Sequence, residues 1–180
     1  MFRTVIVSSV LCLLTACATV PPPPARLGLQ LPPAELGAAI ELQQHLTIER
    51  NGKTDELDAA LEVDQNRLQL VGLAFGQRVL SLNYDGTHMT EWRHFMLPAQ
   101  VKAEDILEDM QLTLWPLESI RKALPAGWTI EDNNLQRSLF MGDTLICVIH
   151  YSAMPRWSGT VQLENLRYRY RITIVSLANN

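Results

Sequence analysis

Beyond its first 16 residues, this 180-residue chain has no hydrophobic stretch long enough to cross a membrane as a helix. It also lacks a strong charge of either sign. Its formal net charge is −4, which makes it a poor candidate for binding nucleic acid through phosphate contacts. No G-x-S-x-G elbow and no phosphate-binding glycine loop occur, and the scattered histidines show no metal-ligand spacing. The sequence therefore offers no catalytic residue, metal site or cofactor site, and we expect a protein that is not an enzyme.

Cysteine is scarce, with three in the whole chain: Cys12, Cys17 and Cys147. The first two belong to the N-terminal segment, which leaves Cys147 without a partner for an internal disulfide. Cys147 stands in the apolar run 145–149. That setting favours a buried hydrophobic role over the alternative, a reactive thiol.

The N-terminus combines one basic residue, Arg3, with an apolar run that ends in Leu14-Thr15-Ala16-Cys17. The run is too short for a permanent membrane helix and small residues precede the cysteine, which is typical of a lipoprotein signal peptide ending in a lipobox. We predict that residues 1–16 are a signal peptide and that Cys17 is lipidated, with several acyl chains as a stable anchor. The alternative is an ordinary secretory signal with an incidental cysteine.

The residue after Cys17 affects whether a lipoprotein is sorted to the inner or the outer membrane. In enterobacterial lipoproteins an aspartate at this place favours retention in the inner membrane, and here it is Ala18. By resemblance to that rule, we expect a protein anchored to the periplasmic face of the outer membrane.

A proline-rich segment follows, with prolines at 21–24 and at 32–33. Such runs favour extended polyproline II structure and act as stiff spacers. We therefore predict that residues 17–38 are a lipidated tether and that residues 39–180 form one domain, a length sufficient for a hydrophobic core.

From residue 39 onward, apolar and polar residues alternate with the period of half-buried strands. The expected strands cover 42–49, 57–63, the surroundings of Leu68 and Leu70, 79–84 and 89–95. Asn51-Gly52 and Asp85-Gly86 supply hairpin turns between them. This part of the chain predicts an antiparallel meander.

Residues 103–124 change to helical spacing, and Pro116 divides them into two helices. The first helix carries acidic residues that predict a solvated face, with a cation site as the alternative: Glu104, Asp105, Glu108 and Asp109. Strands return at 128–131, 138–141 and 144–151.

The closing part of the chain is a loop at 154–159 and one alternating stretch from Leu166 to Ile174. The other face of that stretch carries Arg167, Arg169 and Arg171, which predict a solvated outer face or, as the alternative, a headgroup contact. The expected fold class is mainly β (α+β): a curved antiparallel half-barrel whose concave face is covered by a helical lid.

This arrangement resembles the LolA/LolB family of lipoprotein carriers and outer-membrane receptors over residues 42–175. The segment 70–82 resembles the strand, projecting apolar loop and strand of the receptor, residues 103–125 its helical region and residues 154–175 its closing strands. Similar sequences also occur in a family of uncharacterised lipoproteins encoded near lipid or aryl polyene biosynthesis genes, where we expect this chain to belong. The resemblance implies an open half-barrel with an apolar cavity for acyl chains.

Two groups of residues are candidates for function. Leu73 and Phe75 lie in an unusually apolar connection and predict a finger that touches a membrane or a partner, unless Phe75 folds back onto the core. Phe75 stands where the receptor has a protruding leucine. In a half-barrel, the apolar strand residues line a lipid cavity instead of forming a filled core: Leu46, Ile48, Leu57, Leu61, Leu68, Leu70, Ile172 and Ile174. The lid would consist of Ile106, Met110 and Leu114.

The sequence and the resemblance together predict a monomeric outer-membrane lipoprotein. It would bind an acylated or polyene-like lipid, or the acyl chains of a lipoprotein, and aid its transfer or insertion into the outer membrane. A periplasmic donor protein is the expected partner. The alternative is a non-catalytic assembly lipoprotein with a filled core, whose surface binds a protein partner.

Overall fold

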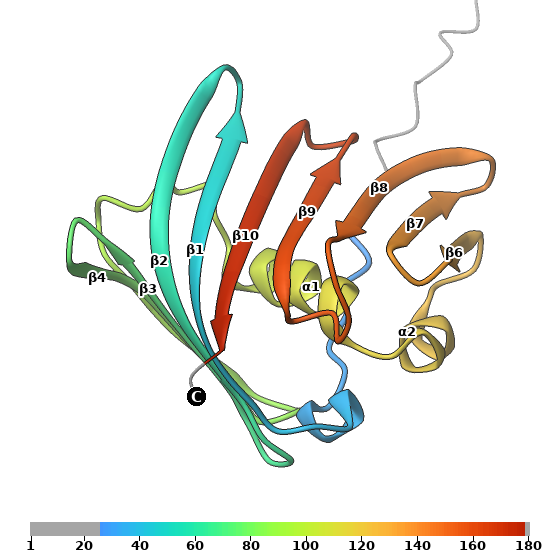
Figure 1. Ribbon diagram of the computed structural model, residues 1–180, viewed down its shortest axis with the longest axis horizontal. Coiled ribbons are helices and arrows are strands. Elements are labelled where there is room, and N and C mark those ends of the chain that lie inside the picture. The colour runs from blue at the N-terminus through green and yellow to red at the C-terminus, as the bar shows by residue number, and fades with distance from the viewer. Residues whose placement is uncertain (1–25, 179–180) are drawn as a thin grey trace, which may run out of the picture.

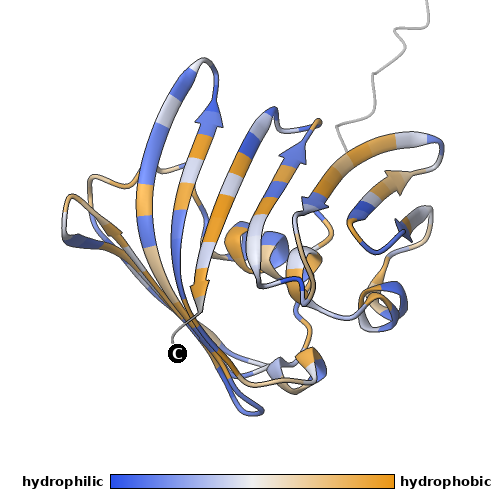
Figure 2. Cartoon of the chain, in the orientation of Figure 1, coloured by the Kyte–Doolittle hydropathy of each residue, from blue (hydrophilic) through white to orange (hydrophobic). Residues whose placement is uncertain are grey.

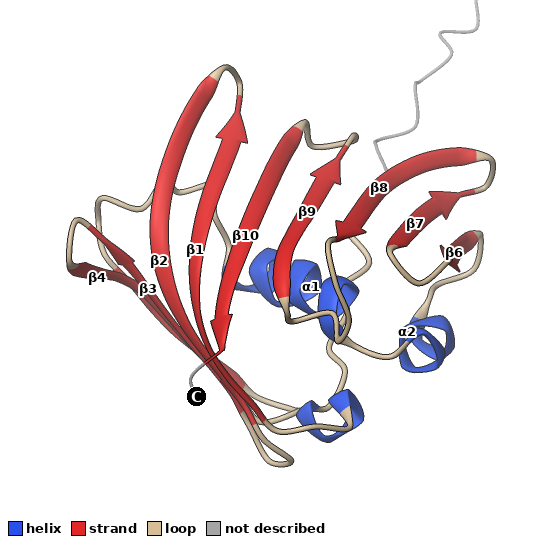
Figure 3. Cartoon of the chain, in the orientation of Figure 1, coloured by secondary structure: helices blue, strands red, loops and turns tan. Residues whose placement is uncertain are grey.

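The computed structural model describes residues 26–178, which form one curved sheet with a helical layer on its concave side (Figures 1 and 3). The chain begins with a short 3-10 helix, η1 (Pro33–Leu36), and two α-helices follow later, α1 (Ala103–Leu114) and α2 (Leu117–Ala123). The strands before the helices are β1 (Ile40–Arg50), β2 (Lys53–Val63), β3 (Leu68–Ala74), β4 (Gln77–Tyr84) and β5 (Met89–Arg93). Those after them are β6 (Trp128–Asp132), β7 (Gln136–Met141), β8 (Thr144–Tyr151), β9 (Gly159–Asn165) and β10 (Tyr170–Ala178).

The ten strands form one antiparallel sheet in the order β5-β4-β3-β2-β1-β10-β9-β8-β7-β6. Strands that are neighbours in sequence pair with each other, except β5 and β6, and the pairing of β1 with β10 joins the two halves of the sheet. The sheet curves without closing, so β5 and β6 remain as its two edges (Figure 1). The prediction of a mainly β fold, a curved antiparallel half-barrel with a helical lid, is confirmed.

The hairpin turns follow the turn chemistry of the sequence. Asn51 and Gly52 both have positive φ, which is the geometry of a two-residue hairpin turn, and the register runs without a break from Arg50 opposite Lys53 to Ile40 opposite Val63. At the β4–β5 turn, the Asp85 carboxylate accepts backbone N–H bonds from His88 and Thr87. These bonds lower the pKa of Asp85 to about 2. Both predicted turns are confirmed.

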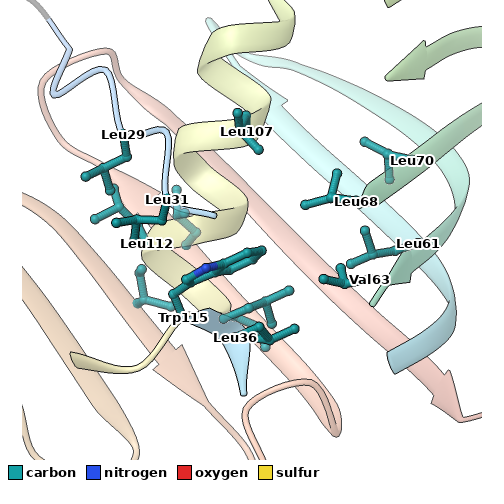
Figure 4. Close-up of a cluster of buried hydrophobic side chains, with 14 of the residues drawn as sticks. Leu29, Leu31, Leu36, Leu61, Val63, Leu68, Leu70, Leu107, Leu112 and Trp115 are labelled. Atoms are coloured by element: carbon teal, nitrogen blue, oxygen red, sulfur yellow. The ribbon is translucent and has the colours of Figure 1, made fainter. Parts of the chain in front are cut away.

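Helix α1 is buried on more than one side, whereas an amphipathic surface helix buries only one face. Its buried side chains include Leu107, Leu112 and Leu114 but also Glu108 and Gln111. Figure 4 shows the reason: the sheet residues face α1 from one side, and an extended N-terminal segment covers it from the other. Pro116 separates α1 from α2, as predicted.

That N-terminal segment, residues 26–36, is called the strap below. It belongs to the folded unit: Leu29, Leu31 and Leu36 are all buried in the core. The predicted start of the domain at residue 39 is therefore too late, and the tether of residues 17–38 does not continue through the strap. Residues 1–25, with the predicted signal peptide and Cys17, lie outside the described part of the chain.

The predicted single stretch from Leu166 to Ile174 is wrong. It contains a turn at 166–169 that joins β9 to β10, and Arg169 takes a positive φ there. The Asn165 side chain fixes the turn by accepting a bond from the backbone N–H of Tyr168. Arg167 and Arg169 therefore lie in a turn, while Arg171 on β10 lies 3.5 Å from Glu49 and 3.3 Å from Glu164.

The core fills the space between the sheet and α1. Apolar and polar residues alternate along β1, β2 and β10 (Figure 2), so each strand turns one apolar face toward the helix. Trp115, at the C-terminal end of α1, is fully buried, and its indole N–H donates to the backbone oxygen of Pro32 in the strap. Within residues 26–178, no helix is long and apolar enough to cross a membrane.

Candidate functional site

The turn between β3 and β4 presents Phe75 to solvent. Phe75 and Gly76 are its two central residues, with φ of 53° and 73°. The Phe75 side chain is 98% exposed, so it does not fold back onto the core. Leu73, the other residue predicted for the finger, is half-buried in β3.

Phenylalanine is an unfavourable residue for this turn. The β1–β2 turn has the same positive φ values but uses Asn51-Gly52, the residue pair that this geometry prefers. A left-handed backbone costs a non-glycine residue roughly 1–2 kcal/mol, and Phe75 makes no core contact that would offset this cost. An exposed aromatic in a strained turn is better explained by contact with another molecule than by stability.

Other exposed apolar side chains gather at the same corner. Since β5 runs antiparallel to β4, its C-terminal end lies beside the start of β4, next to the Phe75 turn, and the backbone N–H of His94 bonds to Val79. Phe95 is 89% exposed, and Trp92 and Met96 are also exposed. Together, Phe75, Trp92, Phe95 and Met96 make up what we call the aromatic corner, which the sequence analysis identified only in part.

The residues predicted to line a cavity share the concave face. Leu61, Leu68 and Leu70 are buried in the core, as Figure 4 shows for their position opposite α1. The others are half-buried and form two rows across the strands. In one row Leu46 lies between Leu57 and Ile174, and in the other Ile48 lies opposite Ile172.

These half-buried residues leave an apolar strip at one end of the concave face. Beside α1 the concave face is packed, because Leu61, Leu68 and Leu70 belong to one buried cluster with Leu107, Leu112 and Leu114.

The predicted lid residues are brought to the same face. Leu114 is buried, and Ile106 and Met110 are half-buried against the core. The lid is covered in turn by the strap. Gln111 exchanges two hydrogen bonds with the backbone of Leu31, at 2.9 and 2.8 Å. Access to the buried part of the concave face therefore requires displacement of α1, the strap or both.

The acidic face of α1 is solvated only in part: Glu104 is exposed as predicted, but Arg26 in the strap covers the other three carboxylates. The Arg26 guanidinium lies 3.0 Å from Asp105 and 2.9 Å from Asp109, and it donates to the Tyr170 hydroxyl. Burial raises the pKa of Asp109 and Glu108, against the attraction of Arg26. The described residues include no group of three metal-binding side chains, so the alternative of a cation site gains no support.

Sequence reasoning missed Arg26 and the strap leucines as contacts of α1. One signal was present: Arg26 is the only charged residue between Cys17 and Pro33, and it precedes the alternating Leu27, Leu29 and Leu31. Cys147 is a free, buried thiol, and burial raises its pKa, so the hydrophobic role predicted for it is the one observed.

A pH prediction follows from Glu108. Its carboxylate accepts the Gly28 N–H at 2.7 Å, and burial raises its folded pKa above the ordinary 4.5. An acid with a raised folded pKa contributes stability while it is protonated, and this contribution is lost as the pH rises above about 4.5. We expect Glu108→Gln, which keeps the acceptor, to have a higher Tm than the wild type at pH 8 and the same Tm at pH 4. A wild-type Tm equal to or above that of Glu108→Gln at pH 8 would contradict this.

Comparison with known protein families places the chain. A family model described as "Protein of unknown function (DUF3261)" matches residues 41–178, from β1 to β10. The chain belongs to the DUF3261 family. The match begins inside β1, so it includes the sheet, the Phe75 turn and both α-helices, but not the strap.

Among solved structures, the chain is similar to a DUF1329 family protein from Desulfovibrio piger. The identity is 11%, the TM-score is 0.36, and the alignment covers 84% of this chain and 88% of the other. No curated protein matches the chain significantly. These comparisons indicate no catalytic family, and the LolA/LolB resemblance stays a prediction.

Proposed function

We propose that this DUF3261 protein is a lipid-anchored protein of the outer membrane that contacts the bilayer through its aromatic corner. Its concave face would bind the acyl chain of a lipid or acylated molecule and aid its transfer, without catalysis. The exposure of Phe75 in an unfavourable turn carries this proposal, because the fold gains nothing from an aromatic there. The predicted lipidation of Cys17 is part of the proposal and lies outside the described residues.

The chemistry of the aromatic corner fits a membrane interface. Aromatic rings are favourable at the level of lipid headgroups, and a methionine adapts to an irregular partner. Arg78 lies over the Trp92 ring at 4.4 Å, so a cation accompanies the apolar side chains. Such a combination suits a surface with anionic headgroups above hydrocarbon.

The apolar strip on the concave face is the proposed route for the acyl chain. Its rows of leucine and isoleucine lie half-buried beside Ile106 and Met110 of the lid. Displacement of α1 would extend this strip into the core, where Leu61, Leu68 and Leu70 continue it. Transfer by this route needs only a difference in affinity between donor, protein and membrane.

Phe75→Asn tests the membrane contact with little risk to the fold, because Asn-Gly is the preferred pair for this turn. We expect binding to vesicles of phosphatidylethanolamine and phosphatidylglycerol to weaken by at least about tenfold, since burying a Phe side chain contributes roughly 1.5–3 kcal/mol. The chain used should begin at Arg26, so that no lipid anchor contributes. Co-sedimentation measures binding, and the Tm should be unchanged or higher.

Leu135→Asn is a matched control, because Leu135 is an exposed apolar residue in the turn before β7 and outside the aromatic corner. It should bind vesicles like the wild type. Equal binding by Phe75→Asn and the wild type would refute the membrane contact. Uptake of a fluorescent fatty acid by the wild type would separately support the acyl route.

The packing of α1 against the concave face favours a second candidate function, an assembly lipoprotein whose surface binds a protein partner. In that case the aromatic corner would contact a protein instead of a bilayer. If the protein binds neither the vesicles nor the fatty-acid probe, this candidate is favoured.

A further inference from the structure

A surface hollow of about 440 Å³ lies on the side of the molecule where η1, the α1–α2 junction and the β8–β9 loop meet (Figure 1). It is formed by segments that are far apart in sequence, and none of its residues belongs to the aromatic corner. Asp132 and Arg137 on the β6–β7 hairpin contribute its polar side, together with Arg156 from the β8–β9 loop. We call it the arginine hollow.

The polar side has more positive than negative charge. Both guanidinium groups bind the one carboxylate: Arg137 Nη2 lies 3.0 Å from Asp132 Oδ2, and Arg156 Nη2 lies 2.6 Å from Oδ1. All three side chains are largely buried, with Arg156 only 12% exposed. Two guanidinium groups share one carboxylate, so the cluster carries a net positive charge that a bound anion would balance.

The two arginines differ in how their donors are used. Arg137 Nη1 donates to the backbone oxygens of Leu112 and Trp115, which ties that guanidinium to the end of α1. Arg156 lies over the Tyr151 ring at 4.4 Å, and its Nη1 is buried with no hydrogen-bond partner among the described residues. A buried donor left unpaired is unfavourable, and an acceptor atom would remove that cost.

Apart from Asn134, the remaining walls are apolar. They include Leu36 from η1, Leu117 from α2 and the two tryptophans Trp115 and Trp157. Met154, which is exposed, forms part of the outer wall. Hydrocarbon or an aromatic ring fits such walls, whereas an inorganic anion would leave them uncovered.

We propose that the arginine hollow binds an oxyanion carried on an apolar body, either a carboxylate or a phosphate with hydrocarbon attached. The positive charge of the Arg156 guanidinium attracts the oxyanion, and its buried Nη1 donates to the oxyanion once the wall of the hollow has moved. The apolar body lies against Trp157 and Leu117. The flexible Met154 side chain is the part of the wall that moves to admit it. This site shares Leu114 with the lid but includes no residue of the apolar strip, and it does not depend on the proposed membrane function.

Titration calorimetry with hexanoate and its neutral counterpart hexanamide tests the proposal. The full chain is held in nonionic detergent micelles, and titrations into empty micelles are subtracted. We expect the wild type to bind hexanoate at least about tenfold more tightly than hexanamide, because a hydrogen bond to a charged group contributes about 1.5–3 kcal/mol. Arg156→Met should lose this preference. Arg121→Met, which removes an exposed arginine from α2, should keep it.

Displacement of hexanoate by acetate or by inorganic phosphate then shows which oxyanion the hollow prefers, and either result supports the proposal. Two outcomes overturn it: equal affinity of the wild type for hexanoate and hexanamide, or an unchanged preference in folded Arg156→Met. The first comparison uses only the wild type, so it decides the matter even if Arg156→Met does not fold.

Discussion

Trp115→Ala should lower the free energy of unfolding by about 3–5 kcal/mol, the range for removing a fully buried large aromatic. Trp115 is 0% exposed and lies between the strap, which ends in η1, and the sheet residues (Figure 4). Its loss leaves a cavity at the point where these parts meet and removes the bond to the Pro32 oxygen. Urea denaturation monitored by circular dichroism measures the change.

Trp92→Ala is the matched control for this experiment. It removes the same side chain from the exposed aromatic corner, and we expect a loss below about 1 kcal/mol. Similar losses for the two variants would contradict the assignment of Trp115 as the residue that joins the strap to the sheet.

Arg137→Met should lower the free energy of unfolding by about 3–5 kcal/mol, the range for removing one partner of a buried ion pair. Arg137 is almost fully buried, and its guanidinium donates twice to Asp132 and once each to the backbone oxygens of Leu112 and Trp115. The variant leaves those two oxygens unpaired at the end of α1. Urea denaturation again gives the magnitude.

Arg156→Met is the comparison that separates the two arginines. It removes the same charge from the same carboxylate, but Arg137 and Asp132 remain as a balanced pair, so the expected loss is below about 1.5 kcal/mol. Equal losses for both variants would show that Arg156 has a structural role like that of Arg137. The small expected loss also makes Arg156→Met suitable for the hexanoate titration.

The sequence predicted those parts of the fold that depend on local chemistry. Asn51-Gly52 fixed the first hairpin, because the turn requires positive φ at two successive residues. Pro116 divided the two helices, because proline lacks the N–H that a continuous helix would use. The exposure of Phe75 was one of two possibilities, since apolar residues in a turn are unusual but do not reveal which way they point.

The parts that were missed depend on contacts between distant residues. The prolines at 32–33 predict a stiff extended spacer, but Pro33 begins the 3-10 helix η1, and nothing local shows that the strap covers α1, some 80 residues away. Glu108 and Asp109 resemble a solvated helix face until Arg26 is placed beside them. Strand β9 was missed because Leu166 and Tyr168 alternate in step with Ile172, which suggests a single strand. Val161 and Leu163, in β9, alternate equally well.

The position of β10 also determines how the sheet can assemble. Strands β1 to β5 and β6 to β10 each pair between sequence neighbours and can form early, but the pairing of β1 with β10 joins residues as distant as Gln44 and Ser176, 132 residues apart. Contacts of such long range form slowly. Until β1 and β10 pair, both are open edges that invite pairing with other chains. This one pairing therefore determines when the two halves of the sheet join and how long their edges stay open to aggregation.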